Sequence, residues 1–298
     1  MATFATSDQL LVVIDPVARH TDGESVRIAK DVLSAGAATK VCLPEGPEEF
    51  ARALARRGSR RPVVVGDDRA LLRAVSVLHR QRELAECALS VVPVGGVMSL
   101  ARSLGVPAGP VAAARAVLDG AERRLDLLVD ESDGVVLGAL RIPPLFPREE
   151  RDGPGGSPAR TAPAGATALA DGAGRPWLRT CQSLVRTLVT RPPRTTAVAG
   201  PPGPSRLRVE VDGVTVVDLD QPVEAVSVTP GEPGIAEVEV RPLSVGAEAS
   251  PLLAEGRTVT VSGTDFRYRA DALVSGPVRS RTWTVREGAW GLTLPVRG

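Results

Sequence analysis

Short, continuously apolar runs alternate with stretches of helical spacing along the first 120 or so residues, and this alternation restricts the fold more than any other feature. Residues 10–14 are all Leu, Val or Ile, as in a strand that is buried on both faces. Residues 24–35 place apolar side chains at helical spacing and stop at Gly36. Helices between successive strands imply right-handed crossovers. The sequence therefore predicts an α/β fold with a doubly wound, mostly parallel sheet covered by helices on both faces.

The same reading assigns the remaining elements of this first part, which we take as one α/β domain spanning residues 1–130. The expected strands are 10–14, 40–43, 62–65, 88–92, 125–129 and 134–140. The expected helices are 24–35, 47–57, 70–82, 99–104 and 111–118.

The hydrophobic period changes to two from Arg206 onward. Leu207, Val209 and Val211 alternate with charged residues, and the following Asp-Gly pair predicts a hairpin turn. Further alternating runs lie at residues 214–219, 224–228, 235–240, 257–261, 281–285 and 291–294. Short strands with turn signals between them predict an antiparallel β-sandwich-like domain, to which we assign residues 131–298.

Two stretches rich in Pro, Gly, Ala and Arg interrupt this second part, at residues 143–176 and 191–205. They lack periodicity, so we expect a flexible insert and a second linker. Between them, residues 177–189 carry one apolar stripe at helical spacing. This short helix is a candidate for docking a protein partner, although such a stripe is more often buried against its own domain.

Composition excludes several classes of function. The net charge of +1 gives no general attraction to nucleic acid, so we expect no nucleic-acid partner. Cys42, Cys87 and Cys181 are widely spaced, which argues against a disulfide framework or a zinc site and for a reducing compartment. The first residues lack the features of a signal peptide, and no apolar run approaches the roughly 20 residues of a membrane span. We therefore expect a cytoplasmic protein.

Three predicted strands end in turns that open helices. Asp15-Pro16 follows the first strand, Gly66-Asp67-Asp68-Arg69 follows the third, and Pro93 with Gly95-Gly96 follows the fourth. Carboxyl ends of parallel strands meet at one sheet edge, where open α/β sheets bind ligands. Helix N-termini at such an edge offer free N–H groups to a phosphate. The alternative is that Asp67, Asp68 and Ser99 simply cap helices.

These turns, with Leu71, Leu100-Ala101-Arg102, Leu118-Asp119-Gly120 and Asp126, resemble the motifs of the diacylglycerol kinase and sphingosine kinase-like lipid kinase family. The resemblance covers roughly residues 10–140 and extends more weakly to the β-rich part. It implies an ATP-binding α/β domain followed by a β-rich domain, ATP and Mg²⁺ as cofactors, and a lipid substrate at a membrane surface. It also implies a set of nucleotide-binding residues, namely Asp15, Pro16, Gly66, Asp68, Arg69, Gly95 and Gly96.

The chain departs from the family at each of these turns. Asp67 and Arg69 stand where the family has glycines, which let the backbone approach the phosphates. Gly96, Val97 and Met98 replace Thr, Gly and Asn, so polar contacts are lost. Asp15 replaces an Asn. These departures put ATP and Mg²⁺ binding in doubt.

The presumed catalytic base is also altered. The family places an Asp-Gly-Glu near the C-terminus, whose Glu acts as the base, and the best match here is Asp271-Ala272-Leu273. Asp271 is therefore the one catalytic candidate, and it is a weak match. Possible metal ligands are Asp212, Asp218 and Asp220, but a hairpin turn and a solvent-facing strand explain them as well, so the metal site stays open.

From these observations the sequence favours a degenerate lipid kinase-like protein with lost or very weak kinase activity and a binding or regulatory role. The alternative is an active ATP-dependent diacylglycerol kinase with an atypical site. Phosphoryl transfer depends on positioning, on Mg²⁺ and on a base, and the chain alters residues at the three nucleotide turns and at the presumed base.

Overall fold

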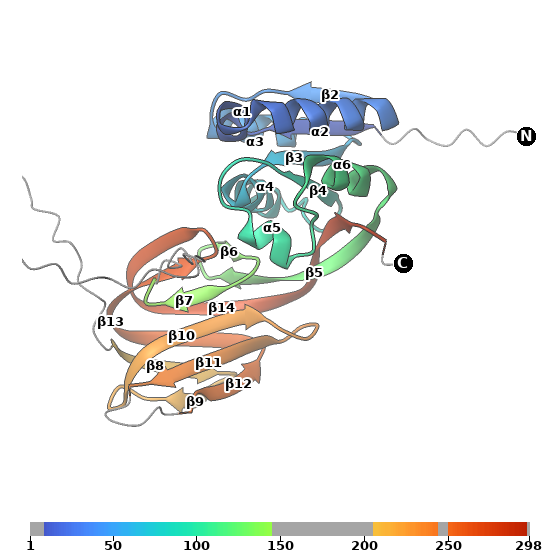
Figure 1. Ribbon diagram of the computed structural model, residues 1–298. Coiled ribbons are helices and arrows are strands. Elements are labelled where there is room, and N and C mark those ends of the chain that lie inside the picture. Colours follow the sequence, from blue (N-terminus) through green and yellow to red (C-terminus); the bar gives the residue numbers. More distant parts are fainter. Residues whose placement is uncertain (1–8, 145–204, 244–249, 297–298) are drawn as a thin grey trace, which may run out of the picture. The chain divides into compact units, whose positions relative to one another are not determined.

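Four parallel strands form one part of the sheet in the computed structural model, which describes residues 9–144, 205–243 and 250–296 (Figure 1). β1 (Leu10–Ile14) lies between β2 (Thr39–Cys42) and β3 (Arg61–Gly66), and β4 (Ala88–Pro93) follows β3. β1 is buried along its whole length, as its unbroken apolar run predicts. β2 is the last strand on its side of the sheet and is more exposed.

Helices cover both faces of these strands. The helices are α1 (Pro16–Thr21), α2 (Gly23–Gly36), α3 (Pro47–Ala55), α4 (Asp68–Arg80), α5 (Ser99–Ser103) and α6 (Pro110–Asp119). Leu10 and Val12 of β1 pack with α2 and α6, whereas Leu11 and Val13 pack with α3 and α4. Successive side chains of a strand point to opposite faces, so the one apolar run serves two cores.

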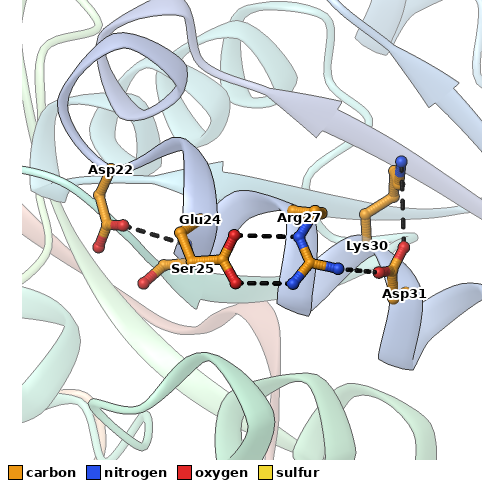
Figure 2. Close-up of polar contacts among 6 residues, drawn as sticks. All are labelled: Asp22, Glu24, Ser25, Arg27, Lys30 and Asp31. Carbon is orange, nitrogen blue, oxygen red and sulfur yellow. Dashed lines mark hydrogen bonds and ion pairs between the residues drawn. The ribbon is translucent and has the colours of Figure 1, made fainter.

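The start of α2 shows how local sequence places a helix (Figure 2). Asp22 is the N-cap, and its side chain accepts a hydrogen bond from the Ser25 amide at 3.0 Å. On the exposed face Arg27 pairs with Glu24 one turn before it and with Asp31 one turn after it. The hydrogen bond from Arg27 lowers the pKa of Glu24. The charged face of α2 is thus exposed to solvent, whereas Val26, Ala29 and Leu33 on its apolar face are buried in the core.

Antiparallel strands make up the rest of the described residues. They are β5 (Ala121–Asp130), β6 (Val135–Val136), β7 (Leu140–Ile142), β8 (Ser205–Val211), β9 (Val214–Val217), β10 (Pro222–Pro230), β11 (Ala236–Pro242), β12 (Leu252–Gly256), β13 (Thr258–Ala270) and β14 (Leu273–Leu294). β7, β10, β8 and β13 pair in a ring around a second apolar core. A β-rich C-terminal part is therefore present, as predicted.

The long strand β14 belongs to both parts (Figure 1). Its first half pairs antiparallel with β13, and most of its second half pairs antiparallel with β5. Near its end, Gly291 and Leu292 pair in parallel with β4. The register with β5 shifts between Arg286 and Trp290, where Gly288 has φ of 51°. This shift lets one strand follow two parts of the sheet.

The predicted sheet needs correction at this point. Residues 125–129 and 134–140 were expected as further strands of a mostly parallel sheet, but β5 pairs antiparallel with β14 and with β6. Parallel pairing joins β2, β1, β3, β4 and the end of β14, and the other pairs are antiparallel, so the sheet is mixed. The physical reason is that β14 takes the place beside β4 that the next strand in sequence would otherwise take. The strands expected at 281–285 and 291–294 are one strand.

Several sequence predictions concern residues that the structure does not describe. The helix at 177–189, nearly all of the two Pro/Gly-rich stretches and Cys181 lie outside the described residues, and the boundary after residue 130 stays a prediction. Within the described residues, the helices are too short or too polar to cross a membrane.

Candidate functional site

The three predicted turns meet at the carboxyl edge of β1, β3 and β4. The register pairs Ile14 with Val65 and Gly66 with Pro93. Beyond the strands, the Asp15 amide still donates to Val65 O at 2.9 Å, and the Val94 amide donates to Gly66 O at 3.0 Å. The structure therefore brings the three turns side by side.

Asp15 is buried at the end of β1 and is the N-cap of α1. One carboxylate oxygen accepts the Val17 amide at 2.9 Å, and the other accepts Arg73 Nη1 of α4 at 2.6 Å. Pro16 occupies the first turn of the helix, where no N–H is needed. Sequence reasoning missed Arg73, because nothing in the order of residues indicates that α4 faces the end of β1.

Glycine at positions 66 and 95 has a local reason. A Cβ on Gly66 would lie 2.6 Å from Ala70 Cβ and 3.0 Å from Asp15 Cβ. Gly95 has φ of +102°, and a Cβ there would also lie 3.0 Å from Thr21 Oγ1 of α1. The two glycines therefore let the turns pack tightly against each other.

Asp67 is the N-cap of α4, as the alternative interpretation of this turn predicted. Its Oδ1 accepts the amides of Arg69 and Ala70, each at 3.1 Å. Its other oxygen faces the next turn, where a Cβ on Gly96 would lie 3.3 Å away. Arg69 itself is exposed at the start of the helix.

Asp68 is only 2% exposed and holds α5. Its carboxylate accepts the amide of Leu100 at 2.9 Å and that of Ala101 at 3.0 Å, and Ser99 Oγ donates to it at 3.3 Å. The expected N-cap role of Ser99 is therefore wrong: Met98 occupies the N-cap position without a side-chain bond, and Asp68 of α4 supplies the acceptor instead.

Each helix that begins at this edge thus carries a carboxylate of the chain itself: Asp15 on α1, Asp67 on α4 and Asp68 on α5. Amides in the first turns of α1, α4 and α5, which could otherwise bind an anion, are bonded to these carboxylates: those of Val17, Arg69, Ala70, Leu100 and Ala101. Two of the carboxylates, on Asp15 and Asp67, are additions relative to the family pattern. These residues do not fit a nucleoside triphosphate, because the negatively charged carboxylates of Asp15 and Asp67 would repel its phosphates.

Asp271 lies in the turn between β13 and β14 with φ of 50°. Its carboxylate accepts three backbone amides, those of Leu137, Gly138 and Ala139, at 2.7 to 2.8 Å. Burial raises the pKa of Asp271, these three hydrogen bonds lower it, and the nearby Asp68 carboxylate raises it further. The Asp271 carboxylate therefore holds the segment of residues 137–139 in place.

Asp68 and Asp271 are linked through the residues they hold. A Cβ on Gly138 would lie 2.8 Å from Leu100 Cδ1 and 3.1 Å from Asp271 Oδ1. The segment bound by Asp271 therefore packs directly on the helix bound by Asp68. The sequence analysis named both aspartates but did not predict the contact between residues 137–139 and α5, since residues 137–139 were expected to lie within a strand.

The candidate metal ligands have other partners. Asp212 sits at the predicted hairpin turn, where its carboxylate accepts the amides of Arg257 and Thr258. Asp218 accepts the amide of Leu219 at 2.7 Å, and Arg208 Nη1 is 3.9 Å from its other oxygen. Asp220 follows in the turn before β10. In the part of the chain that is described, no three His, Cys, Asp or Glu side chains group as a metal site.

Comparison with known proteins finds similarity to diacylglycerol kinases in part of the sequence and in the fold. Residues 9–129 match the model of the diacylglycerol kinase catalytic domain. A structure described as a diacylglycerol kinase from Bacillus anthracis str. Sterne superposes with a TM-score of 0.66 at 12% identity, covering 97% of this chain and 98% of that one. A second from the same organism gives 0.63 at 11% identity, covering 97% and 98%. No curated protein matches the sequence. At such identities the structural likeness establishes the fold alone.

Proposed function

We propose that this chain is a lipid kinase-like protein with lost or very weak kinase activity and a binding or regulatory role. The proposal is supported by the match of residues 9–129 to the diacylglycerol kinase catalytic-domain model and by the similarity of the fold to a diacylglycerol kinase structure. In this proposal the strands β2, β1, β3 and β4, with helices on both faces, correspond to the doubly wound nucleotide domain of the family.

One observation carries the proposal: two helix N-termini at the sheet edge are capped by Asp15 and Asp67, carboxylates that the family pattern does not have at these positions. Phosphoryl transfer depends on positioning and charge neutralisation of the transferred group. Carboxylates in the same place bring charge of the wrong sign and use the same amides. Asp271 adds to this, because its carboxylate is bonded to three amides and the residue two positions on is Leu273.

The second candidate is an active ATP-dependent diacylglycerol kinase with a rearranged site. The observation in its favour is that Asp68 and Asp271 are close enough for the Asp68 charge to act on the Asp271 pKa. In that case Asp68→Ala would abolish turnover. An active kinase would also require Asp15 or Arg73 to move when nucleotide binds, because their ion pair occupies the end of β1.

The partners proposed for the binding role follow from the family and the sequence. A lipid or a membrane surface is the partner that the family implies, with the cytoplasm as the location. A protein partner binding to residues 177–189 is the other proposal, and these residues lie outside the described part. Leu184→Asp would separate the two if it removed a protein association and left the fold intact.

Calorimetric titration with Mg²⁺-ATP and with ADP tests the proposal first. We expect no binding by the natural protein at millimolar nucleotide. The double variant Asp15→Asn, Asp67→Gly removes the two added charges. Asn and Gly are both accepted at N-caps, and Gly in place of Asp lowers helix stability by only about a few tenths of a kcal/mol. We expect this variant to bind nucleotide more tightly.

The matched control is Asp31→Asn, Asp133→Asn, which makes the same change in net charge at two exposed positions. It should leave nucleotide binding unchanged. Micromolar binding of ATP by the natural protein, followed by ATP-dependent phosphorylation of diacylglycerol, would overturn the proposal and favour the active kinase.

A further inference from the structure

A pocket of about 350 Å³ lies between the edge strand β2 and helix α3. Its apolar lining is Leu11, Cys42, Leu43, Pro44 and Ala53. It lies at the edge of the sheet, because β2 is the last strand on its side and α3 packs on β1. A concave apolar site with a few polar groups is the usual form of a small-molecule site.

The charges around this pocket are unbalanced. Lys40, Arg52 and Arg56 line it, against a single carboxylate on Glu49. Glu49 Oε2 accepts the Glu45 amide at 2.9 Å, and Arg52 lies 4.0 Å from Glu48. Within the described residues, Lys40 and Arg56 have no ion-pair partner. Two cations thus face an apolar floor without a counter-charge, in a chain with a net charge of only +1.

We propose that this pocket binds a small anionic amphiphile, with a phosphate or carboxylate held by Lys40 and Arg56 and an apolar body on the floor. Charge complementarity supports the anionic head, since guanidinium and ammonium groups both bind phosphate and carboxylate. Leu43, Pro44 and Ala53 support the apolar body. A bare anion would leave this floor exposed to water.

The cationic end of the pocket is distinct from the capped sheet edge. Leu11 and Lys40 are the second residues of β1 and β2, and Arg56 is at the C-terminal end of α3, away from the turns that hold Asp15, Asp67 and Asp68. The other end of the pocket, at Cys42, Leu43 and Pro44, lies at the carboxyl end of the outer strand β2. The inference therefore goes beyond the proposed function, and either of the two can fail without the other.

Cys42 reports on the pocket because it lines it. The test compares the rates at which iodoacetate, an anion, and iodoacetamide, which is neutral, alkylate each cysteine, read by peptide mass spectrometry. Cys87 is the internal reference, since it is half-buried beside charges of both signs. In water, a cation about 7 Å away should favour the anionic reagent roughly threefold. We expect the iodoacetate-to-iodoacetamide ratio at Cys42 to exceed that at Cys87 by at least this factor.

Charge and salt should change this ratio in a defined way. The double variant Lys40→Gln, Arg56→Gln should lower the iodoacetate-to-iodoacetamide ratio at Cys42 to the value at Cys87. Salt at 1 M should do the same, because it shortens the Debye length to about 3 Å. The control Lys30→Gln, Arg115→Gln makes the same charge change on α2 and α6, over the opposite face of the sheet, and should leave it unchanged. Equal thermal midpoints would show that both variants are folded.

Protection identifies the ligand chemistry. Octyl phosphate should slow alkylation of Cys42 at concentrations where inorganic phosphate does not, and octanol should have no effect. Equal ratios at Cys42 and Cys87 would overturn the proposal. So would a lack of protection by millimolar octyl phosphate, or protection by octanol as strong as that by octyl phosphate.

Discussion

Asp271 has a left-handed backbone conformation and a buried carboxylate that accepts three amides. Asp68 has a similar role one helix away, because it holds α5 through two amides. The resemblance assigned Asp68 to nucleotide binding and Asp271 to catalysis. At the residue scale, both carboxylates are bonded to backbone amides of the chain itself, and each fixes a neighbouring segment in place.

The substitution Asp271→Asn tests this role through pH. Burial raises the pKa of Asp271 above its ordinary value of 3.8, so the folded protein binds this proton more tightly than the unfolded chain does. The contribution of Asp271 to stability is then fully present below about pH 3.8 and is lost as pH rises through the folded-state pKa. Asn carries no such proton, so the variant should gain stability relative to the natural protein as pH rises.

Urea unfolding of both proteins at several values between pH 4 and pH 7 measures this difference. If the natural protein instead gained stability over Asp271→Asn with rising pH, the three amide bonds would outweigh burial and the direction of the pKa shift would be wrong.

At the scale of elements, Gly120 joins α6, β5 and β14. Its amide caps the end of α6 by donating to Ala116 O at 2.9 Å, and β5 begins at the next residue. A Cβ at this position would overlap the carbonyl oxygens of Ala116 and Leu294, which are both backbone atoms and cannot rotate away. The close approach of three elements therefore requires glycine here.

We expect Gly120→Ala to lower the free energy of unfolding by roughly 2 kcal/mol or more, because helix end and strand must separate. Gly23→Ala is the matched control, since a Cβ at the first residue of α2 meets nothing within 4 Å and should stabilise by a few tenths to about 1 kcal/mol. Urea denaturation measures both. An unchanged midpoint for Gly120→Ala would show that α6 and β14 are not held together at this glycine.

For the molecule as a whole, β14 connects two apolar cores. Trp283 is buried in the core enclosed by β7, β8, β10 and β13, and Trp290 is buried in the core beneath α3 and α4. Both side chains belong to one continuous strand. Loss of either core should therefore remove the strand from the other.

We expect the two cores to unfold together. In protein labelled with fluorotryptophan, the ¹⁹F signals of folded Trp283 and Trp290 should disappear at the same urea concentration, with each signal assigned by a Trp→Phe variant. Coincident transitions from different probes are the mark of a two-state protein. Two separate midpoints would show that the parts fold independently and that β14 can leave one of them.

Much of this architecture follows from the sequence alone. Residues 10–14 are apolar without interruption, which favours a strand buried on both faces. The alternation from Arg206 onward favours strands with one face on a core and the other toward solvent. Local chemistry likewise placed the hairpin at Asp212-Gly213 and the N-cap at Asp67. Parallel strands then required the turns after β1, β3 and β4 to meet at one edge.

Pairing between distant strands was decided only by the tertiary structure. Nothing local indicates that Gly291 and Leu292 pair with β4, because strand partners are chosen by long-range packing rather than by the residues of one segment. The partners of buried carboxylates follow the same rule: Arg73 reaches Asp15, and residues 137–139 reach Asp271, across large gaps in sequence. The sequence determined which residues stand at the sheet edge, and the fold determined that their carboxylates bind the chain's own amides and arginine.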